Sequence, residues 1–267
     1  MHNFYEPVSF PAHAGLRWSP PAAFEFAREL RFIPVTLLEL HRAAHCFPLC
    51  LRRIGDTVDV VAVLADHEGR NIHLNGLGTW TADYVPFALR AYPFSLARDA
   101  RDHTPRLAVT RDDDVVGPHG QYELLEPSGR LSGAAAAVYD ELLAAEKSLE
   151  MMRSICRSLL RLEITMQVPP QAIGGRNLRH RLFVVDQDRL DDAWNQQREA
   201  CLALYEKEPA TLHVAETLLF SQRAFVMRAR EPELVEGTIA FASAGGHRVS
   251  TQEDVGSYID YDTNIVF

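Results

Sequence analysis

The longest regular pattern of apolar positions lies in the middle of the chain, between residues 134 and 163. Apolar residues recur there at alternating intervals of four and three, which aligns them in one stripe along an α-helix. The stripe consists of Val138, Leu142, Ala145, Leu149, Met152, Cys156 and Leu159. We therefore predict a long helix from about Ala134 to Glu163 that packs along its own domain, although a stripe of this length leaves a coiled-coil partner open.

Two further helices are indicated by capping residues. Thr36 and Glu39 have the spacing of a capping box, which predicts a helix that runs to about His45. Asp188 is placed to cap a second helix that continues through Tyr205. The apolar stripe of this second helix repeats the intervals of four and three, with Leu190, Trp194, Gln197, Cys201 and Leu204.

Strand-like composition is strongest around Gly55-Asp56. Aliphatic and β-branched residues fill the segments 47–54 and 58–66 on either side of this turn, which predicts a β-hairpin. Residues 71–75 are expected to add a third strand and complete a small antiparallel meander. Other predicted strands are residues 106–110, 122–125 (the start of a second hairpin) and 181–185, and residues 211–226 fit either a helix or a strand.

These elements predict an α+β fold in which a small antiparallel sheet accompanies one long and several shorter helices in a single compact domain. The first 35 residues are rich in proline and aromatic residues, so we expect an extended surface segment with a short helix near Phe24–Leu30. We assign residues 1–223 to the domain and residues 224–267 to a C-terminal extension. The last ten residues include two Tyr, two Ile, a Val and a Phe, which predicts that the extension docks on its own domain or on a neighbouring subunit.

The charge balance narrows the range of partners. The 27 basic and 36 acidic residues give a formal charge of −9, whereas nucleic acids and anionic membranes bind concentrated basic surfaces. We therefore expect no nucleic-acid partner. No run of about 18 apolar residues is present, so no membrane insertion is expected. The four cysteines form no C-x-x-C pair and the N-terminus has no signal-peptide pattern, which predicts a cytoplasmic protein with reduced thiols.

Aromatic side chains are densest between residues 80 and 94, where they accompany a single guanidinium group, that of Arg90. Aromatic rings beside one arginine suit the recognition of a peptide, a carboxylate or a planar ligand. The same composition suits a rigid core corner in which Arg90 caps backbone carbonyls. The candidate ligand- or partner-binding residues are Trp80, Tyr84, Arg90, Tyr92 and Phe94.

Histidines provide the other candidate chemistry. His41 and His45 are one helical turn apart, a spacing that suits zinc or iron, but they are weak candidates because no H-E-x-x-H motif surrounds them. Four scattered histidines would have to converge in three dimensions to form an iron site, namely His67, His73, His103 and His119. There is no G-x-S-x-G motif and no complete G-x-G-x-x-G motif. We therefore predict no catalytic residues, no metal and no cofactor.

The order of residues in the aromatic segment resembles the signature of the SapC family of bacterial proteins. The matching residues are Gly78, Trp80, Tyr84, Pro86, Arg90 and Tyr92-Pro93-Phe94. Weaker similarities are Pro34–Glu39, Phe47-Pro48, Asn71, Val185-Asp186 with Leu190, and Leu212–Ser221. The resemblance covers about residues 30–222. Ala91 stands where the family often has a second arginine, and about 40 residues follow the usual end.

Three functions are compatible with this resemblance. The family is named for an association with bacterial surface layers, so one alternative is a surface-layer-associated structural protein. The missing catalytic motifs favour a non-catalytic accessory module that binds a peptide or protein partner, with a homo-oligomer left open. The other alternative is a metal-dependent enzyme that holds non-haem iron or zinc with the scattered histidines.

Overall fold

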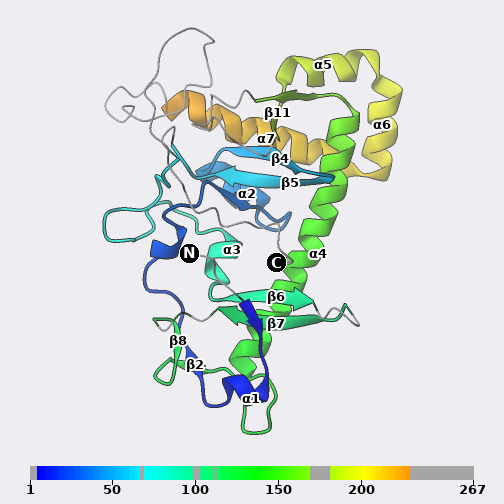
Figure 1. Cartoon of the computed structure of the whole chain (residues 1–267). Helices are drawn as coiled ribbons and strands as arrows, with labels where there is room; N and C mark the ends of the chain where they lie inside the picture. Colours follow the sequence, from blue (N-terminus) through cyan, green and yellow to red (C-terminus); the bar gives the residue numbers. More distant parts are fainter. Residues whose placement is uncertain are drawn as a thin grey trace. The chain divides into compact units, whose positions relative to one another are not determined.

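The computed structural model describes residues 5–66, 69–98, 103–110, 112, 114–168 and 181–228, without the side chains of residues 200 and 223–228. Within these residues the chain forms seven α-helices, a short 3₁₀ helix and three small antiparallel sheets (Figure 1). The predicted α+β class is confirmed. The predicted docking of the C-terminal extension concerns residues that lie almost entirely outside this description.

The described residues divide into two compact units within the α+β fold. Residues 25–86 and 148–228 form the larger unit, and residues 5–24 and 87–147 form the smaller unit. The longest helix, α4 (Gly133–Arg161), contributes its first half to the smaller unit and its second half to the larger unit. Because one boundary falls inside a continuous helix, no linker composition marks it in the sequence.

The larger unit is built on a five-stranded antiparallel sheet. Its strands lie in the order β10 (Thr165–Gln167), β11 (Arg181–Val185), β4 (Leu49–Ile54), β5 (Thr57–Val63) and β3 (Phe32–Pro34). The predicted hairpin is confirmed as β4–β5, and Gly55 at its turn has a φ of 55°, which favours glycine. The predicted third strand at residues 71–75 is wrong. This segment forms turns between isolated bridges, and β3 and β11 flank the hairpin instead.

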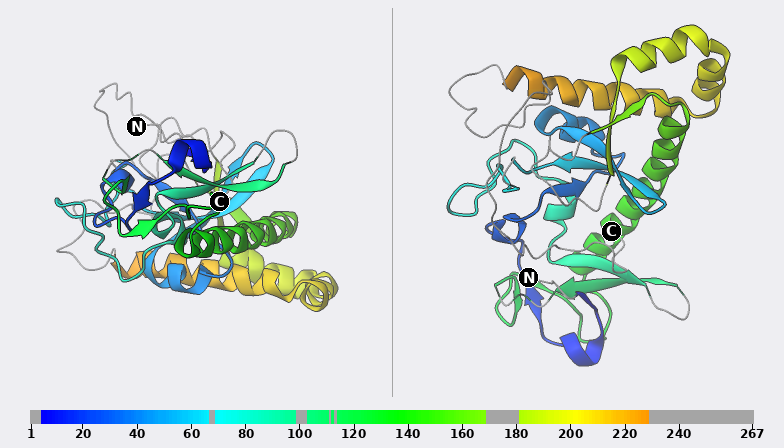
Figure 2. Two further views of the ribbon diagram at one scale, coloured as in Figure 1. Left: turned by 90° about the horizontal axis from the view of Figure 1, so that it is seen from below. Right: turned by 45° about the horizontal axis from the view of Figure 1, so that its top comes forward.

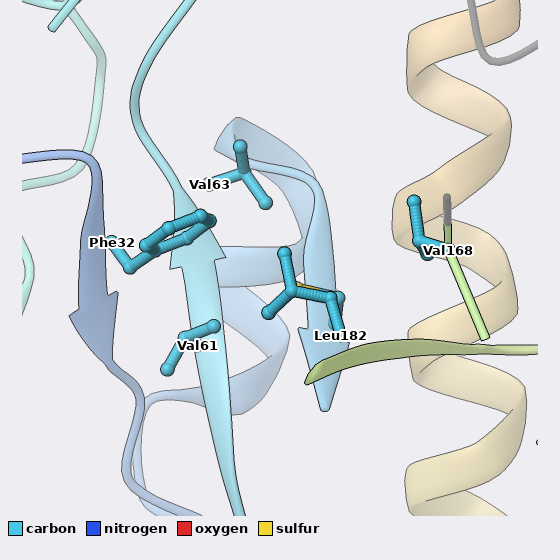
Figure 3. Close-up of a cluster of buried hydrophobic side chains, with 6 residues drawn as sticks. Phe32, Val61, Val63, Val168 and Leu182 are labelled. Atoms are coloured by element: carbon cyan, nitrogen blue, oxygen red, sulfur yellow. The ribbon is translucent and has the colours of Figure 1, made fainter. Parts of the chain in front are cut away.

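Both faces of the interior strand β5 are covered, because every residue of Val58–Val63 is buried. This explains why the strand is an almost continuous run of apolar residues rather than an alternating one. On one face Phe32, Val61, Val63 and Leu182 form a cluster of buried side chains (Figure 3). Helix α7 (Pro209–Arg228) packs against β4 and β11 and against helix α2 (Leu40–Cys46) (Figure 2).

The segment after β11 contains two helices where the sequence predicts one. Asp186, not Asp188, caps α5 (Gln187–Gln196), and its carboxylate accepts the backbone amide of Arg189 at 2.9 Å. The chain then breaks at Gln197, an exposed polar residue inside the predicted apolar stripe, before α6 (Arg198–Lys207) begins. Residues 211–226, for which both helix and strand were open, belong to α7.

The predicted long helix is confirmed as α4, within two residues at each end. Six of the seven residues of its apolar stripe are buried, and Val138 is half-buried. The stripe is therefore covered by the chain itself, which supports packing within the protein and makes a coiled-coil partner unnecessary.

The smaller unit contains two three-stranded sheets. One has the order β1 (Tyr5–Pro7), β7 (Pro105–Thr110) and β6 (Phe94–Arg98), and the other has the order β8 (Val116–Gly117), β2 (Arg17–Trp18) and β9 (Tyr122–Glu123). Two short helices, α1 (Phe10–His13) and α3 (Phe87–Arg90), accompany them. The predicted second hairpin is reduced to a bridge between Leu125 and Leu131.

The sequence predicts that the N-terminal segment only extends along the surface. The structure shows that the segment is also part of the sheets. Its described residues contribute one strand to each of the three sheets, namely β1, β2 and β3. The short helix expected near Phe24–Leu30 is the single 3₁₀ turn η1 (Glu25–Ala27). These strands are too short for a periodic pattern to predict, because two or three residues do not complete an alternation.

Candidate functional site

The five predicted site residues belong to different units. Trp80 and Tyr84 lie in the larger unit, whereas Arg90, Tyr92 and Phe94 lie in the smaller unit. The boundary at Pro86 and Phe87 therefore divides the aromatic segment that the sequence presents as one motif. We describe the two groups separately.

In the smaller unit, Tyr92 and Phe94 are core residues. Phe94 is 2% exposed and packs edge-to-face on Trp18, with ring centroids 4.8 Å apart. Tyr92 is 4% exposed and its hydroxyl donates a hydrogen bond to the carboxylate of Asp112. Burial, together with this hydrogen bond and the negative charge of Asp112, raises the pKa of Tyr92 well above its usual range. Tyr92 and Phe94 therefore fit the rigid core corner, the alternative to a ligand-binding role for the aromatic segment.

Arg90 differs from these two neighbours because its side chain is exposed at the end of α3. Its guanidinium carbon lies 5.6 Å from the centre of the Phe87 ring, a distance typical of a cation–π contact. Arg90 is therefore the predicted site residue of the smaller unit that reaches the surface.

In the larger unit, Trp80 and Tyr84 are half-buried and directly connected. The indole nitrogen of Trp80 donates a hydrogen bond of 2.8 Å to the carbonyl of Tyr84. The Trp80 ring also packs against His73 and Phe47, with centroid separations of 5.6 and 6.0 Å. The hydroxyl of Tyr84 donates to Oε2 of Glu39 at 2.8 Å.

Glu39 connects these aromatic residues to the start of α2. Its Oε1 accepts hydrogen bonds from the backbone amide and the hydroxyl of Thr36, at 3.0 and 3.2 Å. The predicted capping box is thus half correct. Glu39 does hold the amide of Thr36, but the Thr36 hydroxyl donates to the carboxylate and α2 begins later, at Leu40. The side chain of Glu39 is occupied between Thr36 and Tyr84.

Trp80 lies near the end of a surface loop, residues 72–81, which we call the 72–81 loop. Its large apolar side chains at the surface are Leu77, which is 85% exposed, and Ile72, which is 54% exposed. The loop contains no Asp, Glu, Lys or Arg. An apolar residue as exposed as Leu77 gains nothing from burial within its own chain.

Hydrogen bonds fix the shape of the 72–81 loop. The side-chain oxygen of Asn75 accepts the backbone amides of Leu77 and Thr79, both at 2.9 Å. The amide of Thr81 donates to the carbonyl of His73 at 2.9 Å, and the guanidinium of Arg28 donates to the carbonyl of Asn75 at 3.3 Å. The loop is therefore held in one conformation although its apolar tip is in solvent.

Gly78 is favoured in this loop by its backbone conformation, because its φ is +74°. A Cβ atom at this position would also lie 2.6 Å from Oε2 of Glu25, so this exposed carboxylate would have to move. Glu25 is itself paired with Arg28, whose hydrogen bond lowers the pKa of the carboxyl group. The apolar pattern does not predict this loop as a surface feature, although the Asn75-Gly76 dipeptide is a turn signal that marks its position.

The structure changes the arrangement expected for the histidines. His41 lies against His213 of α7, with 2.7 Å between their Nε2 atoms, whereas His45 bonds through Nδ1 to the carbonyl of His41 and packs on Phe220. His73 is buried among aromatic rings, while His103 and His119 are exposed in the smaller unit. His67 lies outside the described residues. Within the described part of the chain, no group of three or more His, Cys, Asp or Glu side chains is arranged to hold a metal ion.

The cysteines are free thiols, as the sequence predicts. Cys50, Cys156 and Cys201 are buried and Cys46 is half-buried. Burial raises the pKa of Cys50 and of Cys156 to about 12. Such thiols are poor nucleophiles, because the thiolate is the reactive form.

The fold and these features define a mixed α+β protein in which a fixed, exposed apolar loop adjoins a network of aromatic residues and one carboxylate. The sequence model of the SapC family matches residues 9–226, and the chain belongs to this family. The resemblance found in the sequence is confirmed, and the match extends beyond its expected range at both ends. No curated protein and no solved structure matches the chain significantly. Among the described residues, no helix combines the length and the apolar content needed to cross a lipid bilayer.

Proposed function

We propose that the protein is a non-catalytic accessory module that binds a protein or peptide partner through the 72–81 loop, with Trp80 and Tyr84 as its supporting residues. The observation that carries this proposal is the exposure of Leu77, at 85%, on a loop held by hydrogen bonds to Asn75 and from Thr81 and Arg28. Of the predicted site, this proposal keeps Trp80 and Tyr84 at the loop and Arg90 as a separate contact, and it adds the exposed Leu77 and Ile72.

Energetics favour such a loop as a contact surface. Burying a leucine side chain in a partner contributes about 1.5–3 kcal/mol. A contact loop that is already ordered loses little conformational entropy on binding, so more of this gain is retained as affinity. Leu77, whose burial by a partner would contribute most to the binding free energy, thus lies on a loop whose conformation is already fixed by hydrogen bonds.

The chemistry of the loop also defines the surface that would receive it. With no charged residue between positions 72 and 81, the loop suits an apolar groove or pocket rimmed by hydrogen-bonding groups. The formal charge of −9 disfavours nucleic acid as the partner. Arg90, exposed in the smaller unit, is the second proposed contact and suits a carboxylate.

The two alternatives have less support. A metal-dependent enzyme would need histidines that converge, and His41, His73 and His119 occupy separate environments. A surface-layer-associated structural role is suggested by the family name, and it requires export. We propose a cytoplasmic location, because the buried reduced thiols suit a reducing compartment.

Site-directed photo-crosslinking in the native cells tests the proposed function. A benzoylphenylalanine residue at position 77 should give one discrete adduct with a partner protein. The matched control is the same residue at position 202, because Leu202 is also an exposed leucine but lies on α6. An adduct with the mass of two chains would identify the partner as a second copy. No adduct at position 77, or the same adducts at both positions, would contradict the proposal.

A stability control separates binding from folding. Leu77→Ser should leave the free energy of unfolding within about 0.5 kcal/mol of wild type, because the side chain is in solvent. The same variant should weaken copurification of the partner identified by crosslinking. Trp80→Ala should lower both stability and binding, because Trp80 packs against His73 and Phe47.

A further inference from the structure

A pair of histidines on the surface of the larger unit forms a feature that the proposed function does not use. His41 on α2 and His213 on α7 are 172 positions apart in the sequence, yet their Nε2 atoms are 2.7 Å apart. Their ring centroids are separated by 4.7 Å, with 57° between the ring planes. Both side chains are exposed, so dissolved ions reach the pair without any rearrangement of the core.

The contact between two ring nitrogens restricts the protonation of the pair. In a neutral imidazole, one nitrogen carries a proton and the other carries a lone pair. A hydrogen bond between the two Nε2 atoms therefore needs one ring to donate and the other to accept. If the donating ring moves its proton to Nδ1, both Nε2 lone pairs face the same point and no net proton is released.

We propose that His41 and His213 form a binding site for a divalent transition-metal ion that prefers nitrogen ligands, such as Cu²⁺, Ni²⁺ or Zn²⁺. Imidazole suits these ions, whereas Mg²⁺ and Ca²⁺ require oxygen ligands. Two nitrogens bound to one ion at about 2.0–2.1 Å, with the usual angles between ligands, are about 2.9–3.4 Å apart. The observed separation of 2.7 Å reaches this range with a small rotation of either side chain. Water molecules fill the remaining coordination positions.

The two helices hold the pair in a fixed frame. The hydroxyl of Ser221 on α7 accepts the backbone amide of Leu49 at 3.1 Å, which ties α7 to the first residue of β4. Ala43 and Ala44 of α2 and Ala215 of α7 are fully buried, in keeping with the packing of these helices against each other. Because the backbone positions are set by the core, the ion does not have to organise the site.

The neighbouring His45 makes other contacts and is not part of this pair. Its Nδ1 donates to the carbonyl of His41 at 2.7 Å, and its ring packs on Phe220 with centroids 4.9 Å apart. The site therefore joins α2 to α7, and it is not the pair one turn apart on α2 that the sequence spacing indicates. An ion bound in this way stabilises the folded state, because the unfolded chain does not hold these two histidines together.

The experiment uses the full chain without an affinity tag. Calorimetric titration with Ni²⁺ should give one site in wild type and at least a tenfold weaker affinity in His41→Ala and in His213→Ala. His119→Ala is the matched control, because His119 is an exposed histidine of the smaller unit. This control should bind like wild type, and Mg²⁺ should not bind to the pair in any variant. Both site residues are exposed, and circular dichroism verifies that each variant is folded.

Spectroscopy distinguishes this pair from other sites. With one equivalent of Cu²⁺, the electron paramagnetic resonance spectrum of wild type should show coupling to two imidazole nitrogens, which falls to one in His213→Ala. Thermal unfolding with Ni²⁺ should show a higher melting temperature in wild type that is lost in both site variants. Unchanged affinity in His213→Ala would overturn the proposal. Loss of binding in His45→Ala with full binding in His213→Ala would also overturn it, because the ion would then occupy the pair on α2.

Discussion

The hydroxyl of Tyr84 donates a hydrogen bond of 2.8 Å to Oε2 of Glu39, which lies 45 positions earlier in the chain. The other oxygen of the same carboxyl group holds the backbone amide and the hydroxyl of Thr36. One buried side chain thus connects the entry to α2 with the residues that follow the 72–81 loop. Hydrogen bonds to a carboxylate are stronger than those between neutral groups, so this connection helps to fix the loop.

Replacement of Tyr84 by Phe tests this connection. Tyr84→Phe removes one donor from Glu39 and should lower the free energy of unfolding by about 1.5–3 kcal/mol, as measured by urea denaturation. Tyr205→Phe is the matched control, because Tyr205 is exposed on α6, and it should change stability by less than about 0.5 kcal/mol. Equal effects of the two substitutions would show that the bond to Glu39 does not stabilise the fold.

Two substitutions in the smaller unit test which residues of the family signature belong to the core and which lie at the surface. Phe94→Ala should lower the free energy of unfolding by about 3–5 kcal/mol, because it empties a buried site beside Trp18. Arg90→Ala should change it by at most about 1 kcal/mol, because the side chain is exposed and an exposed cation–π contact such as that with Phe87 contributes only about 0.5–1 kcal/mol. A large loss of stability in Arg90→Ala would make Arg90 structural and remove it from the proposed contacts.

The cysteines should differ in their rates of reaction with a disulfide reagent. At pH 8, a thiol with a pKa of about 12 is ionised in about one molecule in ten thousand, so Cys50 and Cys156 should react only when the protein unfolds. Half-buried Cys46 should react first in the native protein. Absorbance after addition of a chromogenic disulfide, with and without urea, measures both populations. Four fast equivalents in the native state would contradict the burial of these thiols.

Because of Tyr92, we expect the free energy of unfolding to decrease in alkaline solution. The pKa of Tyr92 is raised in the folded state, so its contribution to stability is complete below the pKa of an unfolded tyrosine, about 10, and is lost as the pH rises above that value. Between pH 8 and pH 11 the stability of wild type relative to Tyr92→Phe should fall by about 1.4 kcal/mol. Urea denaturation at both pH values measures this difference. A pH-independent difference would show that Tyr92 ionises equally in the folded and unfolded states.

The sequence by itself determined the elements whose information is local. The stripe from Val138 to Leu159 sets a helix because each apolar position is separated from the next by about one turn. The β4–β5 hairpin follows from a turn dipeptide between two apolar runs. The family was recognisable for the same reason, because its signature lies in a contiguous stretch from Gly78 to Phe94.

Tertiary structure alone decided which distant residues meet and which side chains reach the surface. The pairs Glu39–Tyr84 and His41–His213 are joined by the packing of α2 against other elements, and no spacing in the sequence encodes that packing. The aromatic segment is continuous in sequence, but its residues divide between the two units. Phe94 is buried in the smaller unit, whereas Leu77 is exposed near Trp80 in the larger unit. Periodicity describes how a residue relates to its neighbours within a few turns, whereas burial depends on which other elements cover it.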